Sequence, residues 1–290
     1  MKEIVQQSFK GERALFQSDS LKIINCTFSD GESPLKESKD LDISGSLFRW
    51  KYPLWYCRNV NVKDSVFDQN TRAGIWYSDN VRFENTVISS PKNFRRSSNV
   101  ELVGVSLSDA KETFWSCSGV NLKNVSAAGD YFMMNTSDVR IDGLKLTGNY
   151  ALDGAENAVI RNSSLVTKDA FWNSKNISVY DSWISGEYLG WNSENLYFEN
   201  CTVESLQGLC YIKNLKMKNC RLIDTTLAFE YSSVDAEIIG RIDSILNPSS
   251  GRIKCDTVCE LIIEEGRVES LKTEIDCPEI VKRLDKPEWL

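Results

Sequence analysis

Histidine does not occur among the 290 residues of this chain. Histidine is the usual general base near neutral pH and a common metal ligand, so its absence excludes Ser-His triads, histidine proton relays and histidine-ligated metals. The sequence also contains no phosphate-cradling glycine-rich loop and no nucleophile elbow. Any acid–base chemistry would have to use carboxylates or the side chains of lysine and arginine.

Long apolar runs are also missing. No stretch of about 18 apolar residues occurs, so we expect no transmembrane helix and no membrane partner. The first residues, MKEIVQQSFKGERALF, lack the apolar segment of a signal peptide, which predicts a cytoplasmic protein. A net charge of −7 argues against a nucleic-acid partner, because nucleic-acid binding usually needs a broadly basic face.

The nine cysteines are an odd number in a chain without a secretory signal, so we expect no disulfide framework. Most are interpreted as small buried residues. Cys255, Cys259 and Cys277 stand near the C-terminus, but without histidine a zinc site there would need thiolates alone or carboxylates. We therefore expect no metal and no cofactor.

What the sequence does contain is a repeat of 19 to 21 residues. Each repeat reads apolar-x-apolar-x-(Asn/Asp/Gly)-x-x-apolar. The first apolar position falls at Leu21, Leu41, Val60, Val81, Val100, Val120, Val139, Ala158, Ile177, Leu196 and Leu215. A fixed period of this size indicates a solenoid, whose repeats bury their apolar faces against one another.

The pattern within one repeat predicts β-strands. Apolar and polar residues alternate at Ile177 to Tyr180, as in a strand with one buried face. The Asn/Asp/Gly position marks a bend, because these residues tolerate left-handed backbone best. A second strand starts at an apolar residue such as Ile184, and a third at Phe171-Trp172.

Three short strands per coil predict an all-β fold, a single-stranded parallel β-helix of eleven or more coils. Leucine-rich repeats, five- or six-residue β-solenoid repeats and doubly wound α/β folds fit the period less well. A right-handed helix is favoured because the coil is irregular. We expect one domain, with residues 1–16 as an N-terminal cap, 17–224 as regular coils, and 225–290 as irregular coils and a C-terminal cap.

The repeat pattern resembles the pectin-lyase-like right-handed parallel β-helix superfamily. Several stretches are similar to a bacterial family within it that carries only a domain-of-unknown-function label: GERALF, DGESPLKES, WKYPLWYC, TRAGIWY, PKNFRR, KDAFWNSKN and GEYLGWNSENL. The resemblance covers nearly the whole chain and implies the fold, but it supplies no catalytic residues. The superfamily is rich in polysaccharide lyases, glycoside hydrolases and sugar-binding proteins, so it implies a carbohydrate ligand by analogy of fold.

Aromatic residues recur at one outward position of the coil, just after an inward apolar residue. This column consists of Trp55, Trp76, Arg95, Trp115, Met134, Asp153, Trp172 and Trp191. A line of five tryptophans on one face indicates a binding surface, because a flat indole suits the apolar face of a pyranose ring. The alternatives are rings covered by loops and rings that form a protein interface.

A second column lies in the loop before the third strand, where Gly-Asp-Tyr, Gly-Asn-Tyr and Gly-Glu-Tyr recur in register. We expect Asp130, Asp153, Asp169 and Glu187 to lie near Tyr131, Tyr150, Tyr188, Trp172 and Trp191. Earlier coils offer Arg72, Arg95 and Arg96 instead. The two columns predict one groove, although a stacked charge column can equally be solvated surface.

Two mechanisms remain open for such a groove. Glycoside hydrolysis needs two carboxyl groups, for which Asp153, Asp169 and Glu187 are the better candidates and Asp130 is a further one. Lys168 would set their pKa values. Elimination from a uronide needs a base of lowered pKa, such as Lys168. The sequence thus predicts a carbohydrate-recognising protein that acts as a hydrolase or lyase on an oligosaccharide. The alternative is a non-catalytic structural or interaction solenoid, for which a homo-oligomer is one option.

Overall fold

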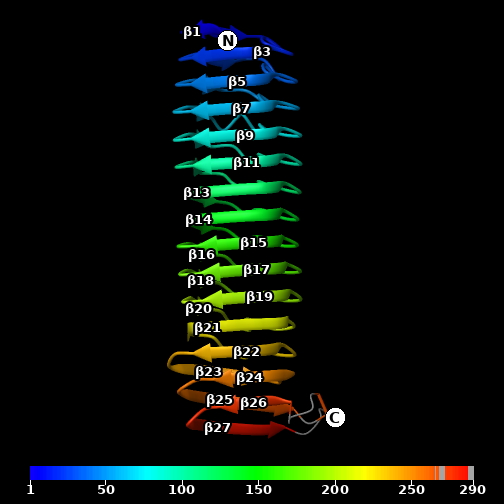
Figure 1. Ribbon diagram of the computed structural model, residues 1–290, viewed down its shortest axis with the longest axis vertical. Coiled ribbons are helices and arrows are strands. Elements are labelled where there is room, and N and C mark those ends of the chain that lie inside the picture. The colour runs from blue at the N-terminus through cyan, green and yellow to red at the C-terminus, as the bar shows by residue number, and fades with distance from the viewer. Residues whose placement is uncertain (265, 268–271, 287–290) are drawn as a thin grey trace. The chain divides into compact units, whose positions relative to one another are not determined.

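The computed structural model describes residues 1–264, 266–267 and 272–286. These residues contain strands and turns and no helix. By its internal contacts the chain divides into two compact units, Met1–Gly148 (unit 1) and Asn149–Leu290 (unit 2), and the predicted single domain stays a prediction. Each unit is a β-solenoid in which parallel strands stack coil on coil, as Figure 1 shows for either unit.

Unit 1 contains pairs of strands separated by a bend, and in its last two coils the pair merges into one long strand. Its strands are β1 (Lys2–Val5), β2 (Ser8–Lys10), β3 (Asp19–Ile24), β4 (Thr27–Ser29), β5 (Lys39–Ser44), β6 (Leu47–Phe48), β7 (Arg58–Lys63), β8 (Val66–Phe67), β9 (Asp79–Glu84), β10 (Val87–Ile88), β11 (Ser98–Val103), β12 (Ser106–Leu107), β13 (Ser118–Ala128) and β14 (Ser137–Thr147).

Unit 2 follows the same plan. Its strands are β15 (Glu156–Arg161), β16 (Ser164–Val166), β17 (Lys175–Tyr180), β18 (Trp183–Ser185), β19 (Glu194–Glu199), β20 (Thr202–Glu204), β21 (Lys213–Ile223), β22 (Ser233–Ile238), β23 (Arg241–Leu246), β24 (Ser250–Lys254), β25 (Thr257–Glu264), β26 (Thr273–Asp276) and β27 (Glu279–Lys286).

The predicted repeat register is confirmed within each unit. In unit 1, Leu41 pairs with Val60, which pairs with Val81. In unit 2, Ile177 pairs with Leu196, which pairs with Leu215. Because side chains alternate along a strand, this register places the whole apolar set of each coil on one inner face.

The inner face forms a continuous core in each unit. Val179 is 0% exposed whereas its neighbour Ser178 is half-buried, as the alternating pattern predicts. At the start of the second strands in unit 1, Phe28, Phe48 and Phe67 stack with ring centroids 4.7 and 4.4 Å apart. Equivalent side chains therefore pack directly on one another from coil to coil.

The bends are built as predicted from left-handed residues. Gly104 and Gly143 have φ values of 63° and 78°, and Asn200 has 55°. At another corner of unit 2 the asparagine amides form a ladder, in which Asn195 donates to Asn176 at 2.9 Å and Asn214 donates to Asn195 at 2.7 Å. The asparagines of this ladder also have positive φ values. Asparagine therefore suits this corner both by its tolerance of left-handed backbone and by its amide, which explains why it recurs there.

The predicted third strand is wrong. Each regular coil has two strands and a third side made of turns, on which left-handed backbone recurs at every second residue, as at Lys92, Phe94 and Arg96. A strand needs extended backbone throughout, so this alternation prevents strand formation. The coils still hydrogen-bond there, for example from the Arg95 N–H to the Ile75 carbonyl at 3.1 Å.

The ends of the chain differ from simple caps. Residues 1–16, predicted as an N-terminal cap, contain β1 and β2, which pair in register with β3 and β4. In residues 225–290, predicted as irregular coils and a C-terminal cap, β22, β24 and β26 pair in turn, and β23, β25 and β27 form a second sheet. Residues 265, 268–271 and 287–290 of that cap lie outside the described residues.

Candidate functional site

The tryptophan column of unit 1 lies on the third side of the coil. The residues that precede its members, such as Leu54, Ile75 and Phe114, are 0% exposed, so the predicted inward and outward assignment holds. The Trp55 and Trp76 rings are stacked with centroids 5.1 Å apart and planes at 6°. Both faces of Trp76 are therefore covered, by Trp55 on one side and Arg95 on the other.

Arg95 takes the place of a tryptophan in this column, and its guanidinium stacks between the Trp76 and Trp115 rings. Its guanidinium carbon lies 4.9 Å from the Trp76 centroid and 4.4 Å from the Trp115 centroid. An ion pair to Glu112 at 2.8 Å holds the guanidinium in place. Burial opposes ionisation of Glu112, but Lys92 and Arg95 outweigh it and lower the pKa of that carboxyl. The Arg95 guanidinium is thus already in contact with Glu112 and two indole rings. Arg72 and Arg96, which were also predicted to bind a ligand, are exposed.

Each predicted tryptophan is also fixed by its indole nitrogen. Trp55, Trp76 and Trp115 donate to backbone carbonyls of the next coil in unit 1, at 2.5, 2.6 and 2.8 Å. Trp172 and Trp191 do the same in unit 2, at 2.9 and 2.7 Å. All five rings are half-buried.

The second predicted column is also present within each unit. In unit 1, the Glu112 N–H donates to the carbonyl of Asp130 at 2.9 Å, and Tyr131 packs edge-on against Trp115 with centroids 6.3 Å apart. In unit 2, the corresponding column runs through Tyr150, Asp169 and Tyr188, whose backbone N–H groups bond to the following coil. Asp169 therefore stands where its neighbours in the column carry a tyrosine.

The tryptophan column of unit 2 has a similar exchange. The Gly154 N–H donates to the Trp172 carbonyl at 2.7 Å, which places Asp153 in the column next to Trp172. The Trp172 and Trp191 rings are stacked with centroids 5.9 Å apart and planes at 7°. Asp153 accepts a hydrogen bond from the Asn173 amide at 3.1 Å. We call the place where Asp153 and Asp169 replace two rings the carboxylate notch.

Asp169 is the unusual group of the notch, because it is a carboxyl only 3% exposed. Burial raises its pKa, and the nearby charges of Glu187 and Asp153 raise it further, while Lys168 lowers it. Carboxyls buried among other carboxylates hold their protons more tightly than solvated ones. The notch therefore combines one carboxyl of raised pKa with neighbouring acidic groups.

Lys168 and Glu187 close one side of the notch. They form an ion pair at 3.0 Å, and the Lys168 ammonium lies 5.2 Å from the centre of the Tyr188 ring. The hydrogen bond to Glu187 raises the pKa of Lys168. Lys168 is thus held as a cation, which is the opposite of what a base for elimination needs.

Within unit 2, the structure brings together several members of the predicted site. Asp153, Lys168, Asp169 and Glu187 interact electrostatically with one another or with a shared neighbour. Asp130 and Tyr131, together with Trp55, Trp76 and Trp115, belong to unit 1. The single groove predicted from Asp130 to Trp191 has residues in both units, and it stays a prediction.

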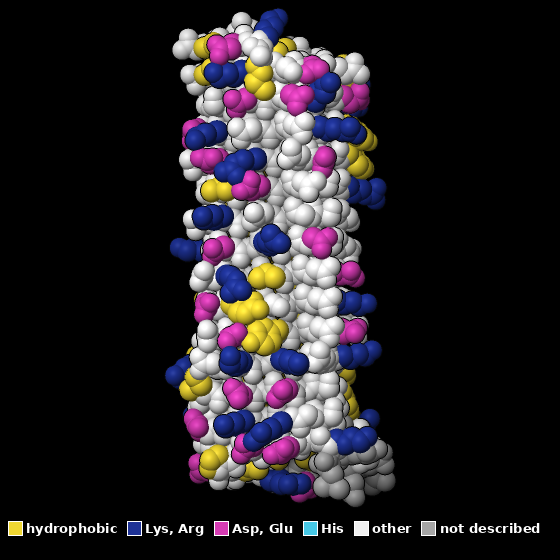
Figure 2. Space-filling view, viewed as in Figure 1, with side chains coloured by type: hydrophobic (Ala, Val, Ile, Leu, Met, Phe, Trp, Pro, Cys, Tyr) yellow, Lys and Arg dark blue, Asp and Glu magenta, His cyan; other side chains and the backbone are white. Residues whose placement is uncertain are grey.

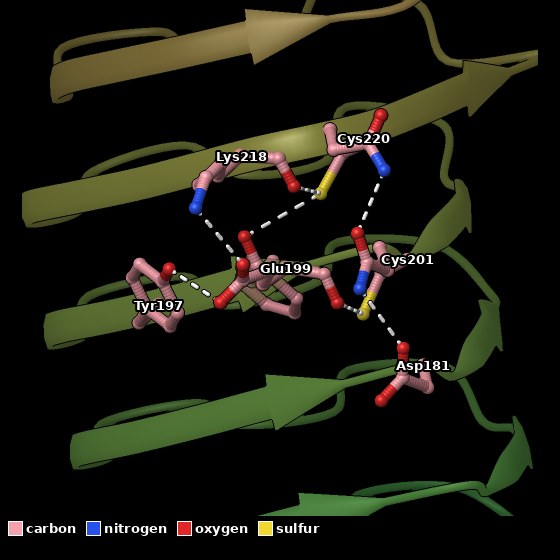
Figure 3. Close-up of polar contacts among 9 residues, drawn as sticks. Asp181, Tyr197, Glu199, Cys201, Lys218 and Cys220 are labelled. Atoms are coloured by element: carbon pink, nitrogen blue, oxygen red, sulfur yellow. Dashed lines mark hydrogen bonds and ion pairs between the residues drawn. The ribbon is translucent and has the colours of Figure 1, made fainter.

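Sequence reasoning missed a second aromatic cluster in unit 2, on the outward face of the first strands. The Arg161 guanidinium lies 3.9 Å from the Tyr180 ring centre, and the Tyr180 and Tyr197 centroids are 5.6 Å apart. Tyr197 donates to Glu199 at 2.8 Å, and Glu199 pairs with Lys218 at 3.1 Å, as Figure 3 shows.

Figure 2 shows hydrophobic side chains gathered on the face over β15, β17 and β19, between charged ones. The signal was present in the sequence, because outward strand positions that are polar in most repeats carry tyrosine at 180 and 197. The hydrogen bond from Tyr197 to Glu199 raises the pKa of Tyr197 to about 12. This phenol is therefore a hydrogen-bond donor at neutral pH and not a base.

A shallow groove lies on unit 1 at the bends. It has a volume of about 320 Å³ and is lined mainly by small residues around Gly104, Asn124 and Gly143, with Lys145 at one edge. Among the described residues, no group of three or more cysteine or acidic side chains is placed to hold a metal ion. The described part of the chain also has no helix long and apolar enough to cross a membrane.

Comparison with known proteins identifies a family. The model of a family described as "Protein of unknown function (DUF3737)" matches residues 2–276. No protein among the curated sequences matches the chain.

Three solved structures illustrate the resemblance in fold. PfbA, a surface adhesin of Streptococcus pneumoniae, is 10% identical with a TM-score of 0.40, covering 97% of this chain and 80% of its own. The A-module of the mannuronan C-5 epimerase AlgE4 of Azotobacter vinelandii is 10% identical with a TM-score of 0.27, covering 99% and 87%. HetL, a pentapeptide repeat protein of Nostoc sp. strain PCC 7120, is 9% identical with a TM-score of 0.23, covering 80% and 86%. Such low scores carry no argument about function.

Proposed function

We propose that unit 2 binds an oligosaccharide at the carboxylate notch. The chain belongs to the DUF3737 family of proteins of unknown function. The observation that carries the proposal is the exchange of one ring for a carboxylate in each of two neighbouring aromatic columns, at Asp153 and Asp169. A sugar needs both an apolar surface and hydrogen-bond acceptors, and the notch offers both within two coils.

Trp172 supplies the apolar surface. Trp191 stacks on Trp172, and the hydrogen bond from the Gly154 N–H to the Trp172 carbonyl places Asp153 beside Trp172 in the preceding coil. An aspartate is much smaller than an indole, so it covers less of the neighbouring ring than a stacked tryptophan would. Tyr188 and Trp191, whose ring centroids are 5.2 Å apart, form the adjoining wall.

The carboxyl groups support hydrolysis more than elimination. The raised pKa of Asp169 suits this carboxyl to the role of general acid, while Asp153 and Glu187 are the carboxylates for the second role. Lys168 is a positioning residue that neutralises Glu187 through their ion pair. We place the protein in the cytoplasm, so the ligand would be an imported oligosaccharide.

The alternative function is a non-catalytic structural or interaction solenoid. It is favoured by the column of unit 1, where Trp55, Trp76, Arg95 and Trp115 cover one another's faces. Rings used in this way stabilise the stack of coils and leave only their edges for a partner. In that case the tryptophans would be buried in a homo-oligomer.

A glycan array read out by tryptophan fluorescence tests the proposal. We expect a set of related glycans to bind, and Trp172→Ala to weaken the binding by roughly 5- to 100-fold, or about 1–3 kcal/mol, as for loss of a large aromatic contact. The matched control is Trp76→Ala, because the faces of Trp76 are covered by Trp55 and Arg95. This variant should bind normally.

Turnover is tested separately on any glycan that binds. Asp169→Asn should abolish hydrolysis and leave affinity nearly unchanged, because the amide cannot donate the proton in the transition state. Equal losses of binding in Trp172→Ala and Trp76→Ala would contradict the notch as the site. A stable oligomer that shields the tryptophans, with no glycan bound, would favour the interaction solenoid.

A further inference from the structure

Unit 2 contains two pairs of cysteines that stand in register on adjacent coils. Cys201 and Cys220 follow equivalent bends, and the Arg221 N–H donates to the Cys201 carbonyl at 2.9 Å. Cys255 and Cys277 directly follow the paired residues Lys254 and Asp276 of β24 and β26. All four thiols are free.

Register places each pair at the right separation for a disulfide. Strands of a sheet lie about 4.8 Å apart, which is within the range of roughly 4.4–6.8 Å for the Cα atoms of a cystine. The Cys255 N–H donates to the Asp276 carbonyl at 3.2 Å, so the two coils are in contact directly beside the second pair. The backbone would need little rearrangement to accept the bond.

Solvent access separates the two pairs. Cys201 and Cys220 are 2% and 0% exposed, and their thiols donate to backbone carbonyls of their own and the preceding coil. Figure 3 shows this pair on neighbouring coils, with Cys201 between β19 and β20 and Cys220 in β21. Cys255 is 4% exposed, but Cys277 is half-buried and within reach of solvent.

We propose that Cys255 and Cys277 are a redox-modification site, at which an oxidant of the low-molecular-weight disulfide class converts the two thiols into a reversible bond between the coils of β24 and β26. The thiolate of Cys277 attacks one sulfur of the oxidant, forms a mixed disulfide and releases one small thiol. The thiol of Cys255 then loses its proton, attacks the Cys277 sulfur and releases the second small thiol. Two protein thiols are oxidised and one small disulfide is reduced to two thiols.

The order of attack follows from the two environments. Burial raises the pKa of Cys255 to about 12, with its neighbour Cys277 as the second cause. A thiol of this kind is a poor nucleophile toward a reagent in solution and can react only with a partner already beside it. Cys277, whose thiol donates to the Glu279 carbonyl at 3.0 Å, is the accessible member of the pair.

The experiment treats the full folded chain with oxidised glutathione at mildly alkaline pH and maps disulfides by peptide mass spectrometry without reduction. We expect one intramolecular disulfide, between Cys255 and Cys277, loss of two hydrogen atoms in the intact mass, and full reversal by a reducing agent. Cys255→Ser and Cys277→Ser should each abolish the bond, and Cys277→Ser should also lose the mixed disulfide intermediate.

Cys259→Ser is the matched control, since Cys259 is also half-buried, lies in β25 and follows Val258, which pairs with Ile280. That variant should oxidise as the parent chain does. Circular dichroism of each serine variant establishes that it is folded before oxidation. A folded chain that stays fully reduced, or one that links Cys201 to Cys220 or Cys259 to Cys277 instead, would overturn the proposal.

Discussion

Asp169 shows how one side chain alters the surface on which it stands. Its neighbours in the column are Tyr150 and Tyr188, and a tyrosine can expose its hydroxyl while its ring is covered. An aspartate at the same place is 3% exposed and carries its charge into the wall of the coil. The folded protein therefore favours the protonated form of this group.

Asp169→Asn is expected to stabilise unit 2 near neutral pH. The pKa of Asp169 is raised in the folded state, so its favourable contribution is fully present below the usual carboxyl range and is lost as pH rises through the folded-state pKa. An amide does not ionise and loses nothing over this interval. Urea unfolding followed by circular dichroism should show parent and variant converging at low pH and the variant more stable at pH 7.

The control for this comparison is Asp235→Asn, because Asp235 is an exposed aspartate of β22 in the same unit. It should shift the unfolding midpoint little, and without the same dependence on pH. If Asp169→Asn were as stable as the parent at every pH, the carboxyl would be solvated in the folded protein, and its role as a proton donor would lose its basis.

The sequence allowed the members of the notch to be predicted but not their roles. The tripeptides around Tyr131, Tyr150, Asp169 and Tyr188 align by inspection, so their common position in the coil followed from the repeat. The burial of Asp169 and the ion pair of Lys168 with Glu187 did not follow, since they depend on how the corner turns.

At the scale of elements, the bends and the third side follow different rules. The bends require one left-handed residue and select Asn, Asp or Gly. The third side has left-handed backbone at every second residue and accepts even Phe94, Phe114 and Phe171 there. Since aromatic residues normally favour strands, their local preference predicted a third strand, and the tertiary packing of their rings determined another conformation.

Gly143→Val tests the bend. Gly143 has a φ of 78°, and a Cβ atom there would lie 2.8 Å from Oδ1 of Asn124 in the coil before it. A β-branched residue would therefore meet both backbone strain and a steric clash, and we expect a loss of stability of about 2 kcal/mol or more. The measurement is the change in the urea unfolding midpoint.

Asn124→Gly is the matched control, because Asn124 occupies the equivalent bend with a φ of 53°. Glycine adopts this conformation without strain, so the change should cost less than about 1 kcal/mol, mainly in unfolded-state entropy. A larger loss for Asn124→Gly than for Gly143→Val would show that the Asn124 side chain matters more than the left-handed backbone.

For the molecule as a whole, the repeat determines most of the fold. The period, the inward apolar positions and the bends were all predicted, because each depends on contacts that recur from coil to coil. The third side, which is built of turns, and the division into two units were not predicted from the sequence. Right-handedness and membership of the pectin-lyase-like superfamily stay predictions.

Stability in such a fold is expected to be local. Each coil contacts mainly the coils before and after it, so unfolding free energy resembles a sum of nearest-neighbour terms. Leu196 of β19 is 1% exposed and pairs with Ile177 and Leu215. Leu196→Ala should cost about 2–5 kcal/mol by leaving a cavity.

Amide hydrogen exchange measures where that loss appears. We expect faster exchange in β17, β19 and β21 and unchanged exchange in β3 to β11 of unit 1. The control is Tyr197→Ser at a half-buried outward position of the same strand, which should leave exchange in β17 and β21 slow. Uniform acceleration throughout both units would mean that the chain unfolds as one cooperative body.

The register of the coils also bears on how genes for such chains can change length. Strand pairing in unit 1 links Val60 to Val81 and Val81 to Val100. The two repeats differ in length, yet their strands pair in the same register. The extra residues of the longer repeat therefore lie between the strands. Insertions at those corners are therefore tolerated, whereas a single inserted codon within β9 would turn every following side chain of that strand to the opposite face. Duplication or loss of a whole coil keeps both faces intact, so we expect natural length variants to differ by complete coils or by corner residues.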